Sequence, residues 1–236
     1  LANMLASHME LDNPQHREYV QQFWNSPHIA QHAGLKAVDL FQAVETGEIK
    51  AIWIMATNPV VSMPDADQVK RALEKCEFVV VSDICINTDT TVYADVLLPA
   101  LAWGEKEGTV TNSERRISRQ RAFLSAPSTV KADWWAVAQV AKKLGFSGFD
   151  FQSAHEIFLE HAQLSAYQNV ALSERDQTDA FRYFNLQGLS DLSAEEYADL
   201  SPIQWPVWEK PQELIGKSSA KNNPSAIQSS PKIDQA

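Results

Sequence analysis

Polar side chains follow three apolar runs of this sequence, at the places where the chain is expected to turn. Asn58 closes the run IKAIWIMATNP, Ser82 and Asp83 close EFVVVSDI, and Lys106 follows ADVLLPA within WGEKEG. If the runs are parallel strands, their carboxyl ends meet at one sheet edge, where open α/β folds bind ligands. Asn-Pro and Ser-Asp also suit ordinary turns. Because they recur at three successive strand ends, we interpret these residues as a candidate binding site.

The chemistry available at this edge is recognition of a polar ligand, and no residue is assigned a catalytic role. Asp83 and Asp133 can each accept two hydrogen bonds, which matches the N1–H and N2–H2 donors of guanine. Lys106 would supply positive charge for phosphates. GxGxxG and GxxxxGK[ST] motifs are missing and there are only eight glycines, so side chains must hold the ligand. The paired Arg115 and Arg116 are interpreted as structural salt bridges or surface charge.

The elements that would position these residues alternate between strand and helix patterns. We expect strands in the three apolar runs, each buried on both faces, and a short helix around TDTTVYA. Helices are expected in NPQHREYVQQFW, GLKAVDLFQAVETG, PDADQVKRALEKC, DWWAVAQVAKKLGF and SAHEIFLEHAQLS. Gly47 and Gly145 are expected after helix ends, and Asp133 and Ser153 as N-caps. This order predicts an α/β fold, a Rossmann-like parallel sheet flanked by helices.

Composition limits the classes of partner and metal site. The net charge of -10 disfavours nucleic acid, and no apolar run approaches the length of a membrane span. The two cysteines, Cys76 and Cys85, form no CxxC pair, and the six histidines form no HxH or HxxxH pair. We therefore expect no metal site, no disulfide and no cysteine-ligated cluster, and a reducing cytoplasm as the location. The start at Leu1 and the missing secretory signal lead us to expect a piece of a longer cytoplasmic protein.

The domain organisation is expected to change twice along the chain. We predict a cofactor-binding α/β domain over residues 1–168. Residues 169–210, where the pattern weakens, are expected to extend that domain or to begin a linker. Residues 211–236 are polar and rich in Ser and Pro, so they are predicted to be a disordered tail.

Four stretches together resemble one protein family: WIMATNPVVSMPDA, VVVSDICINTDTTVYADVLLPA, WGEKEGTVTNSERRISRQR and KADWW. They are similar to the third domain of the molybdopterin-guanine-dinucleotide oxidoreductases. SERRISRQR, LANMLASHM and PIQWPVW look most like the assimilatory nitrate reductase catalytic subunit, over about residues 1–210. The resemblance implies a molybdenum-bis(molybdopterin guanine dinucleotide) cofactor and reduction of nitrate to nitrite. It also places the dinucleotide contacts on Asn58, Ser82, Asp83, Lys106 and Asp133.

The chain also departs from that family. The cysteine motif for a [4Fe–4S] cluster is missing, as is the segment that gives the family's cysteine ligand to molybdenum. Cys85 is interpreted as a small buried thiol, and the chain alone is expected to be inactive. The implied partners are the remaining domains of the parent enzyme and its electron-donor protein or subunit. Two alternatives stay open, namely the same domain of a formate dehydrogenase and a non-catalytic nucleotide-binding or interaction module. The missing glycine motif disfavours an adenine-dinucleotide dehydrogenase.

Overall fold

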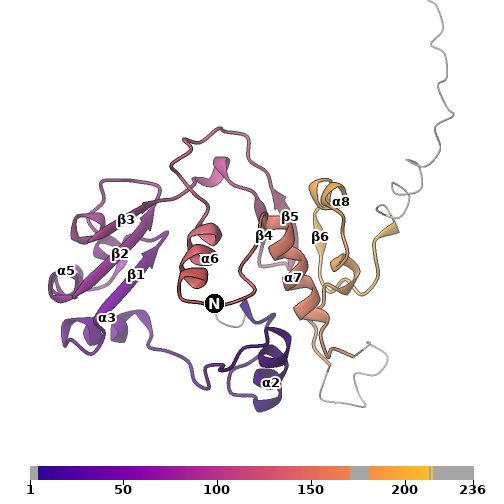
Figure 1. Ribbon diagram of the computed structural model, residues 1–236, viewed down its shortest axis with the longest axis horizontal. Coiled ribbons are helices and arrows are strands. Elements are labelled where there is room, and N and C mark those ends of the chain that lie inside the picture. The colour runs from indigo at the N-terminus through magenta and orange to yellow at the C-terminus, as the bar shows by residue number, and fades with distance from the viewer. Residues whose placement is uncertain (1–4, 171–180, 213, 215–236) are drawn as a thin grey trace, which may run out of the picture.

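The three apolar runs form a parallel sheet in the computed structural model, which describes residues 5–170, 181–212 and 214. Strands β1 (Ala51–Met55), β2 (Phe78–Asp83) and β3 (Val96–Pro99) lie in the order β1-β2-β3 (Figure 1). Met55 is level with Ser82 and Ser82 with Leu98, so the carboxyl ends of all three strands lie at one edge. The predicted α/β fold with a parallel sheet is confirmed.

One face of this sheet is covered by two helices, α3 (Ala37–Glu45) and α5 (Ala66–Lys75). The strand residues Ile54, Val79 and Val81 are buried there with Val44 and Val69 of the helices. The short helix α4 (Pro59–Ser62) follows β1, and the 3-10 helix η1 (Thr91–Tyr93) lies between β2 and β3. The connection from β1 to β2 contains α5, and α3, which precedes β1, packs beside α5.

The opposite face of the sheet is largely uncovered by the described residues. It carries the alternate side chains of the strands, and Phe78 and Val96 are 46% and 37% exposed there. Trp53 and Val80 on the same face are only half-buried. The prediction that the strands are buried on both faces is therefore wrong for this chain. A continuous apolar run indicates that both faces avoid water, but it does not say which segment covers them.

The stretch that follows β3 leaves the parallel sheet and forms a second one. After the 3-10 helix η2 (Trp103–Glu105), strands β4 (Gly108–Thr111) and β5 (Arg116–Gln120) pair antiparallel, and β6 (Ile203–Gln204) joins β5. Arg116 forms an exposed ion pair with Glu114 at 2.8 Å. Arg115 lies over the ring of Trp205, with its guanidinium carbon 5.2 Å from the ring centre. Arg116 therefore forms a salt bridge as the sequence predicts, whereas the exposed Arg115 contacts an aromatic ring, which the sequence analysis did not predict.

The rest of the chain builds a separate core around α7 (Ala154–Ala166). Phe158 and Ala162 of α7 pack with Leu186, Leu189 and other buried residues of the segment 181–214. This segment contains η4 (Gln187–Leu189) and α8 (Ala194–Ala198). Two further helices, α2 (Pro14–Phe23) and α6 (Asp133–Lys143), complete the described elements. The predicted cap Ser153 accepts a hydrogen bond from the N–H of Glu156, and Gly47 and Gly145 have the positive φ that helix ends favour.

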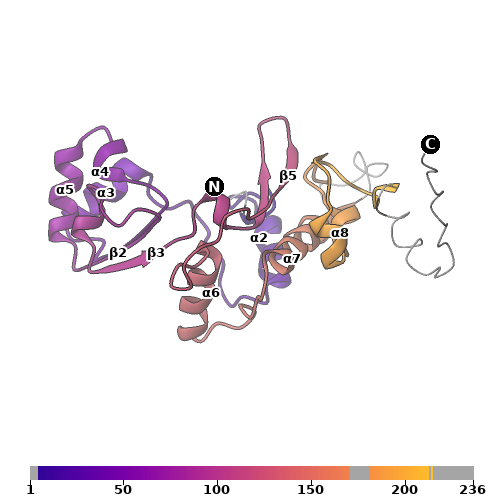
Figure 2. The same ribbon diagram turned by 90° about the horizontal axis from the view of Figure 1, so that it is seen from above.

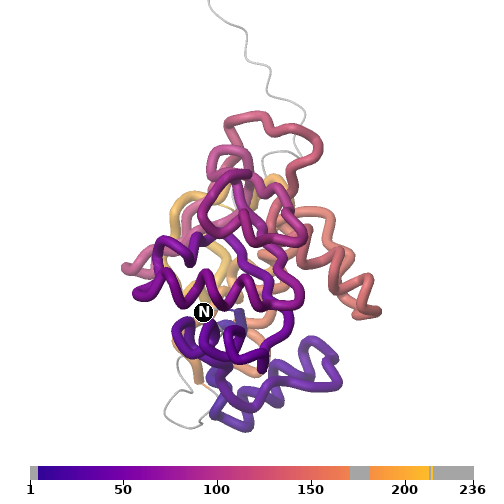
Figure 3. Tube along the Cα trace, turned by 90° about the vertical axis from the view of Figure 1, so that its left-hand side faces the viewer, coloured from indigo at the N-terminus to yellow at the C-terminus, as the bar shows by residue number. Residues whose placement is uncertain are grey.

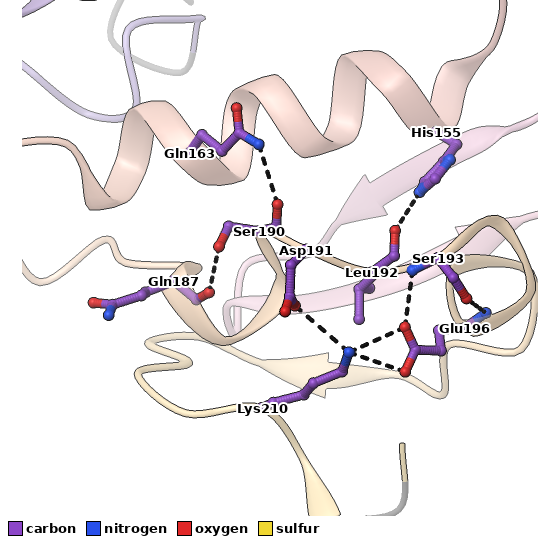
Figure 4. Close-up of polar contacts among 9 residues, drawn as sticks. All are labelled: His155, Gln163, Gln187, Ser190, Asp191, Leu192, Ser193, Glu196 and Lys210. Carbon is purple, nitrogen blue, oxygen red and sulfur yellow. Dashed lines mark hydrogen bonds and ion pairs between the residues drawn. The ribbon is translucent and has the colours of Figure 1, made fainter. Parts of the chain in front are cut away.

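A polar network fastens the C-terminal segment to α7 (Figure 4). Lys210 Nζ lies 2.9 Å from Glu196 Oε1 and 3.5 Å from Asp191 Oδ1. Glu196 also accepts from the N–H of Ser193 at 2.8 Å, which closes a capping box at the start of α8. On the α7 side, the ring of His155 bonds the carbonyl of Leu192 at 2.7 Å.

The molecule is elongated, and α2, although it precedes the parallel sheet in the chain, packs beside α7 rather than beside that sheet. Figure 2 shows the parallel sheet and its helices at one end, α6 in the middle, and α7 and α8 toward the other end. In Figure 3, seen from the sheet end, the violet trace of the sheet helices lies in front of the orange and yellow C-terminal segments. The site residues are therefore positioned by the first of these parts and by the start of α6.

Candidate functional site

The chain returns from the antiparallel hairpin to the parallel sheet just before α6. Ala100 and Lys131 form a parallel bridge, in which the N–H of Lys131 donates to the carbonyl of Pro99 at 3.2 Å. The N–H of Leu101 donates in turn to the carbonyl of Lys131 at 3.0 Å. This short pairing extends the sheet beyond β3 and sets the first turn of α6 beside the carboxyl end of the strands.

Asp133 is the first residue of α6, where its carboxylate is paired with Lys106. Lys106 Nζ lies 3.1 Å from Asp133 Oδ2, and the two side chains are 29% and 31% exposed. The N-cap is Ala132, so the prediction of Asp133 as N-cap is wrong by one residue. A carboxylate in the first turn is still favoured by the helix dipole. The other oxygen, Oδ1, is buried and has no hydrogen-bond partner among the described residues.

That unpartnered oxygen belongs to a residue that lines a small cavity. The cavity has a volume of about 70 Å³ and lies between the end of the sheet and the start of α6. Its lining consists of Ser82, Leu98, Pro99, Ala100, Thr129, Lys131, Ala132, Asp133 and Ala136. A buried carboxylate oxygen normally has a donor, so this cavity is suited to an N–H or O–H group of a ligand.

Ser82 reaches the same cavity from the uncovered face of the sheet. Its side chain is 3% exposed, and its Oγ accepts from the indole Nε1–H of Trp53 at 2.8 Å. An indole nitrogen can only donate, so the proton of the Ser82 hydroxyl is directed to another acceptor. Ser82, Asp133 and Lys106 thus form one group at this edge.

Asn58 belongs to a second polar group, which follows the carboxyl end of β1. Its Oδ1 accepts from the hydroxyl of Thr90 at 2.6 Å, and Thr90 Oγ1 accepts from the N–H of Val60 at 3.2 Å. Val60 also lines a wider hollow of about 410 Å³, together with Lys70, Asn87, Thr88, Asp89, Val92 and Tyr93. Asn58 therefore has a different hydrogen-bond partner from Ser82, although both follow strand ends.

Asp83 is engaged locally. Its Oδ1 accepts from the N–H of Cys85 at 2.8 Å, which is the hydrogen bond of an Asx turn. Because neighbouring strand residues point to opposite faces, Asp83 does not share the side of Ser82. The thiol of Cys85 is exposed, so its interpretation as a buried thiol is wrong. Both cysteines are free, and Cys76 lies 3.4 Å from the carbonyl of Lys50.

The sequence reasoning missed two residues that hold the site side chains in place, Trp53 and Thr90. In the sequence, Trp53 is one of several apolar residues in an expected strand and has no distinguishing signal. The parallel register of β1 and β2 brings it next to Ser82. Thr90 was one of several threonines in TDTTV, and only the fold shows that it is the fully buried one. The assignment of the five predicted residues to a cofactor stays a prediction.

Other classes of site leave no trace in the described part of the chain. No group of three or more His, Cys, Asp or Glu side chains is arranged there to hold a metal ion. No helix in that part is long and apolar enough to cross a membrane. The histidines of α7 have packing roles. The ring of His161 lies 5.5 Å from that of Phe184, and burial lowers the pKa of His161.

The sequence comparisons show which family the chain belongs to. The family model of the molybdopterin oxidoreductases matches residues 2–143, more than half of the chain. The chain belongs to the molybdopterin oxidoreductase family.

Individual relatives carry more specific names. The chain is 52% identical over 208 residues to a nitrate reductase of Klebsiella oxytoca, a match that covers 88% of this chain and 23% of that protein. It is 34% identical to the assimilatory nitrate reductase catalytic subunit of Bacillus subtilis, covering 70% of this chain and 23% of that one. A formate dehydrogenase 1 subunit alpha of Methanococcus maripaludis is also 34% identical, over 72% of this chain and 25% of that subunit. The chain thus spans about a quarter of the length of these relatives.

Proposed function

We propose that the chain is part of a molybdenum-dependent nitrate reductase and holds one guanine dinucleotide of a molybdenum-bis(molybdopterin guanine dinucleotide) cofactor. The identity of 52% over 88% of the chain to a nitrate reductase supports this assignment. The formate dehydrogenase alternative has weaker support, at 34% identity over 72% of the chain. When bound, the molybdenum centre supplies the oxygen-atom transfer that converts nitrate to nitrite.

The observation that carries the proposal is the unpartnered Oδ1 of Asp133 at the cavity. Guanine offers N1–H and N2–H2 to a carboxylate, whereas adenine offers an acceptor at N1 and no amino group at C2. Asp133 supports this base-reading role better than Asp83, because Asp83 already closes its own turn. With a volume of about 70 Å³, the cavity suits one edge of a base rather than a whole nucleotide.

The other site residues would act on the rest of the nucleotide. Lys106 is paired with Asp133 and supplies positive charge to this group. Ser82 and Asn58 add neutral polar groups at neighbouring strand ends. In this proposal the chain works with the remaining domains of the parent enzyme and an electron-donor protein, in the cytoplasm. A [4Fe–4S] cluster would be held by those other domains.

Calorimetric titration of GDP and ADP tests the proposal on the chain itself. We expect the wild type to bind GDP more tightly than ADP. Asp133→Asn should lower the affinity for GDP by about 10-fold to 100-fold, because a hydrogen bond to a charged group contributes about 1.5–3 kcal/mol. Asp83→Asn should have a smaller effect, and Asp12→Asn, at an exposed position, serves as the matched control. Equal affinities for GDP and ADP in the wild type would end the guanine assignment.

The activity requires the complete polypeptide. We expect that protein to form nitrite from nitrate with an artificial electron donor, and the present chain alone to form none. Oxidation of formate by the complete protein, without nitrite formation, would favour the formate dehydrogenase alternative. A complete protein free of molybdenum would favour a non-catalytic binding module.

A further inference from the structure

Thr90 fixes which way the side-chain amide of Asn58 faces. Thr90 is fully buried, and its hydroxyl lies 2.6 Å from Asn58 Oδ1 and 3.2 Å from the nitrogen of Val60. The N–H of Val60 can only donate, so it occupies a lone pair of the hydroxyl. The one hydroxyl proton is then given to Asn58 Oδ1. This arrangement satisfies a buried group that would otherwise be costly to leave unpaired.

The consequence for Asn58 is that its NH2 group is turned away from Thr90. Neither proton of this group has an acceptor in the part of the chain that the structure describes. Asn58 is half-buried, and its carbonyl end is held by a fully buried partner. Both amide protons of Asn58 are therefore available to hydrogen-bond acceptors that do not belong to the described residues.

The same arrangement recurs at the neighbouring strand. Trp53 donates its indole N–H to Ser82 Oγ at 2.8 Å. The Ser82 hydroxyl therefore accepts from Trp53, and its own proton is available for a different acceptor. Ser82 is 3% exposed and lines the cavity at the sheet edge. Its proton has no acceptor within residues 5–170, 181–212 and 214. Two adjacent strand ends thus each carry a polar side chain whose accepting atom is already occupied.

We propose that Thr90 and Trp53 are positioning residues that turn Asn58 and Ser82 into hydrogen-bond donors, so that this sheet edge takes the acceptor-rich diphosphate of a nucleotide. This inference rests on the proposed function, which places a nucleotide at the same edge. The chain carries a net charge of -10, Lys106 is paired with Asp133, and Lys131 at the cavity lies over the ring of Trp135. Neutral donors would therefore add to these two lysines in holding phosphate oxygens.

The test compares GDP with guanosine, because only GDP has the diphosphate. In Thr90→Val the amide of Asn58 loses its fixed orientation, and we expect GDP to bind about 10-fold more weakly. Guanosine should bind as in the wild type, and Thr90→Ser, which keeps the hydroxyl, should bind GDP as the wild type does. A merely structural role for Thr90 would weaken both ligands equally, and that result would overturn the inference. So would unchanged GDP binding in Thr90→Val, although the proposed function would then stand.

Two further variants keep the test open should Thr90→Val fail to fold. Asn58→Asp retains the acceptor for Thr90 but replaces the NH2 donor, so we expect a loss in GDP affinity of at least about 10-fold. Trp53→Phe removes the indole N–H that donates to Ser82, so the Ser82 hydroxyl is no longer held in one orientation. We expect this variant to bind GDP more weakly and guanosine as the wild type does. Unchanged GDP affinity in both folded variants would overturn the inference.

A probe independent of the base separates this inference from the proposed function. The side-chain amide signals of Asn58 can be assigned in a nitrogen-15 spectrum as the pair that Asn58→Asp removes. Inorganic pyrophosphate should shift these signals in the wild type and leave them unshifted in Thr90→Val. If the wild type binds neither GDP nor guanosine, the proposed function fails and pyrophosphate decides the inference. No shift with pyrophosphate in the wild type would then overturn the inference as well.

Discussion

Replacing Lys106 by Met should destabilise the chain, because it leaves the carboxylate of Asp133 without its cation. Fully exposed ion pairs contribute about 0.2–1 kcal/mol, whereas breaking a buried pair costs about 3–5 kcal/mol. Side chains that are 29% and 31% exposed lie between these limits. We therefore expect a loss of about 2 kcal/mol, which corresponds to about 4–8 °C in Tm for a chain of this size.

The second oxygen of Asp133 sharpens this prediction. Since Oδ1 already lacks a partner, Lys106→Met leaves the whole carboxylate without a side-chain donor. Asp133→Asn removes the charge and should cost less, about 1 kcal/mol. The double variant should lose about 1 kcal/mol less than the sum of the two single variants, because the isolated charge is then absent.

The measurement is urea unfolding of the four proteins, followed by circular dichroism. Lys36→Met, at an exposed position, is the matched control and should change stability by less than about 0.5 kcal/mol. If Lys106→Met behaves like Lys36→Met and the two site variants are additive, the pair does not hold α6 to the sheet edge. The reasoning about the site would then be refuted.

Three other predictions concern the C-terminal part of the chain. The backbone N–H in the capping box of α8 lowers the pKa of Glu196, so its contribution is present above the ordinary carboxyl pKa and is lost as pH falls through the lower folded value. The stability difference between wild type and Glu196→Gln should therefore shrink between about pH 7 and about pH 3 in urea titrations. Gly188→Ala should cost about 3 kcal/mol in the same assay, because a Cβ there would lie 2.1 Å from the carbonyl oxygen of Glu209, whereas Gly34→Ala meets no atom within 4 Å. Burial lowers the pKa of His161, so stability should fall as pH drops below about 6.5, and His161→Phe should reduce that fall.

Much of the sheet could be predicted because its signals are local. Continuous apolar runs closed by polar residues indicated three strands, and Gly47 and Gly145 marked helix ends where φ is positive. The helix cap Ser153 was likewise found from its place before an apolar pattern. Such features depend only on residues that are close in the chain, so a short stretch of sequence is enough to predict them.

The contacts of the site could not be predicted because they join distant parts of the chain. Lys106 and Asp133 are 27 residues apart, and the antiparallel hairpin lies between them. Thr90 and Asn58 are 32 residues apart, and their contact depends on the crossover from β1 to β2. Strand-end reasoning pointed to this edge of the sheet, but it could not say which polar groups there already have hydrogen-bond partners.

The uncovered face of the parallel sheet has a consequence for how the chain behaves in solution. Phe78 and Val96 lie exposed on it, and apolar patches of this kind attract one another. The net charge of -10 opposes that attraction by keeping copies apart. Salt shortens the reach of this repulsion from about 30 Å at 0.01 M to about 10 Å at 0.1 M. The colloidal stability of the chain is therefore expected to fall as ionic strength rises, and light scattering across a salt series would record it.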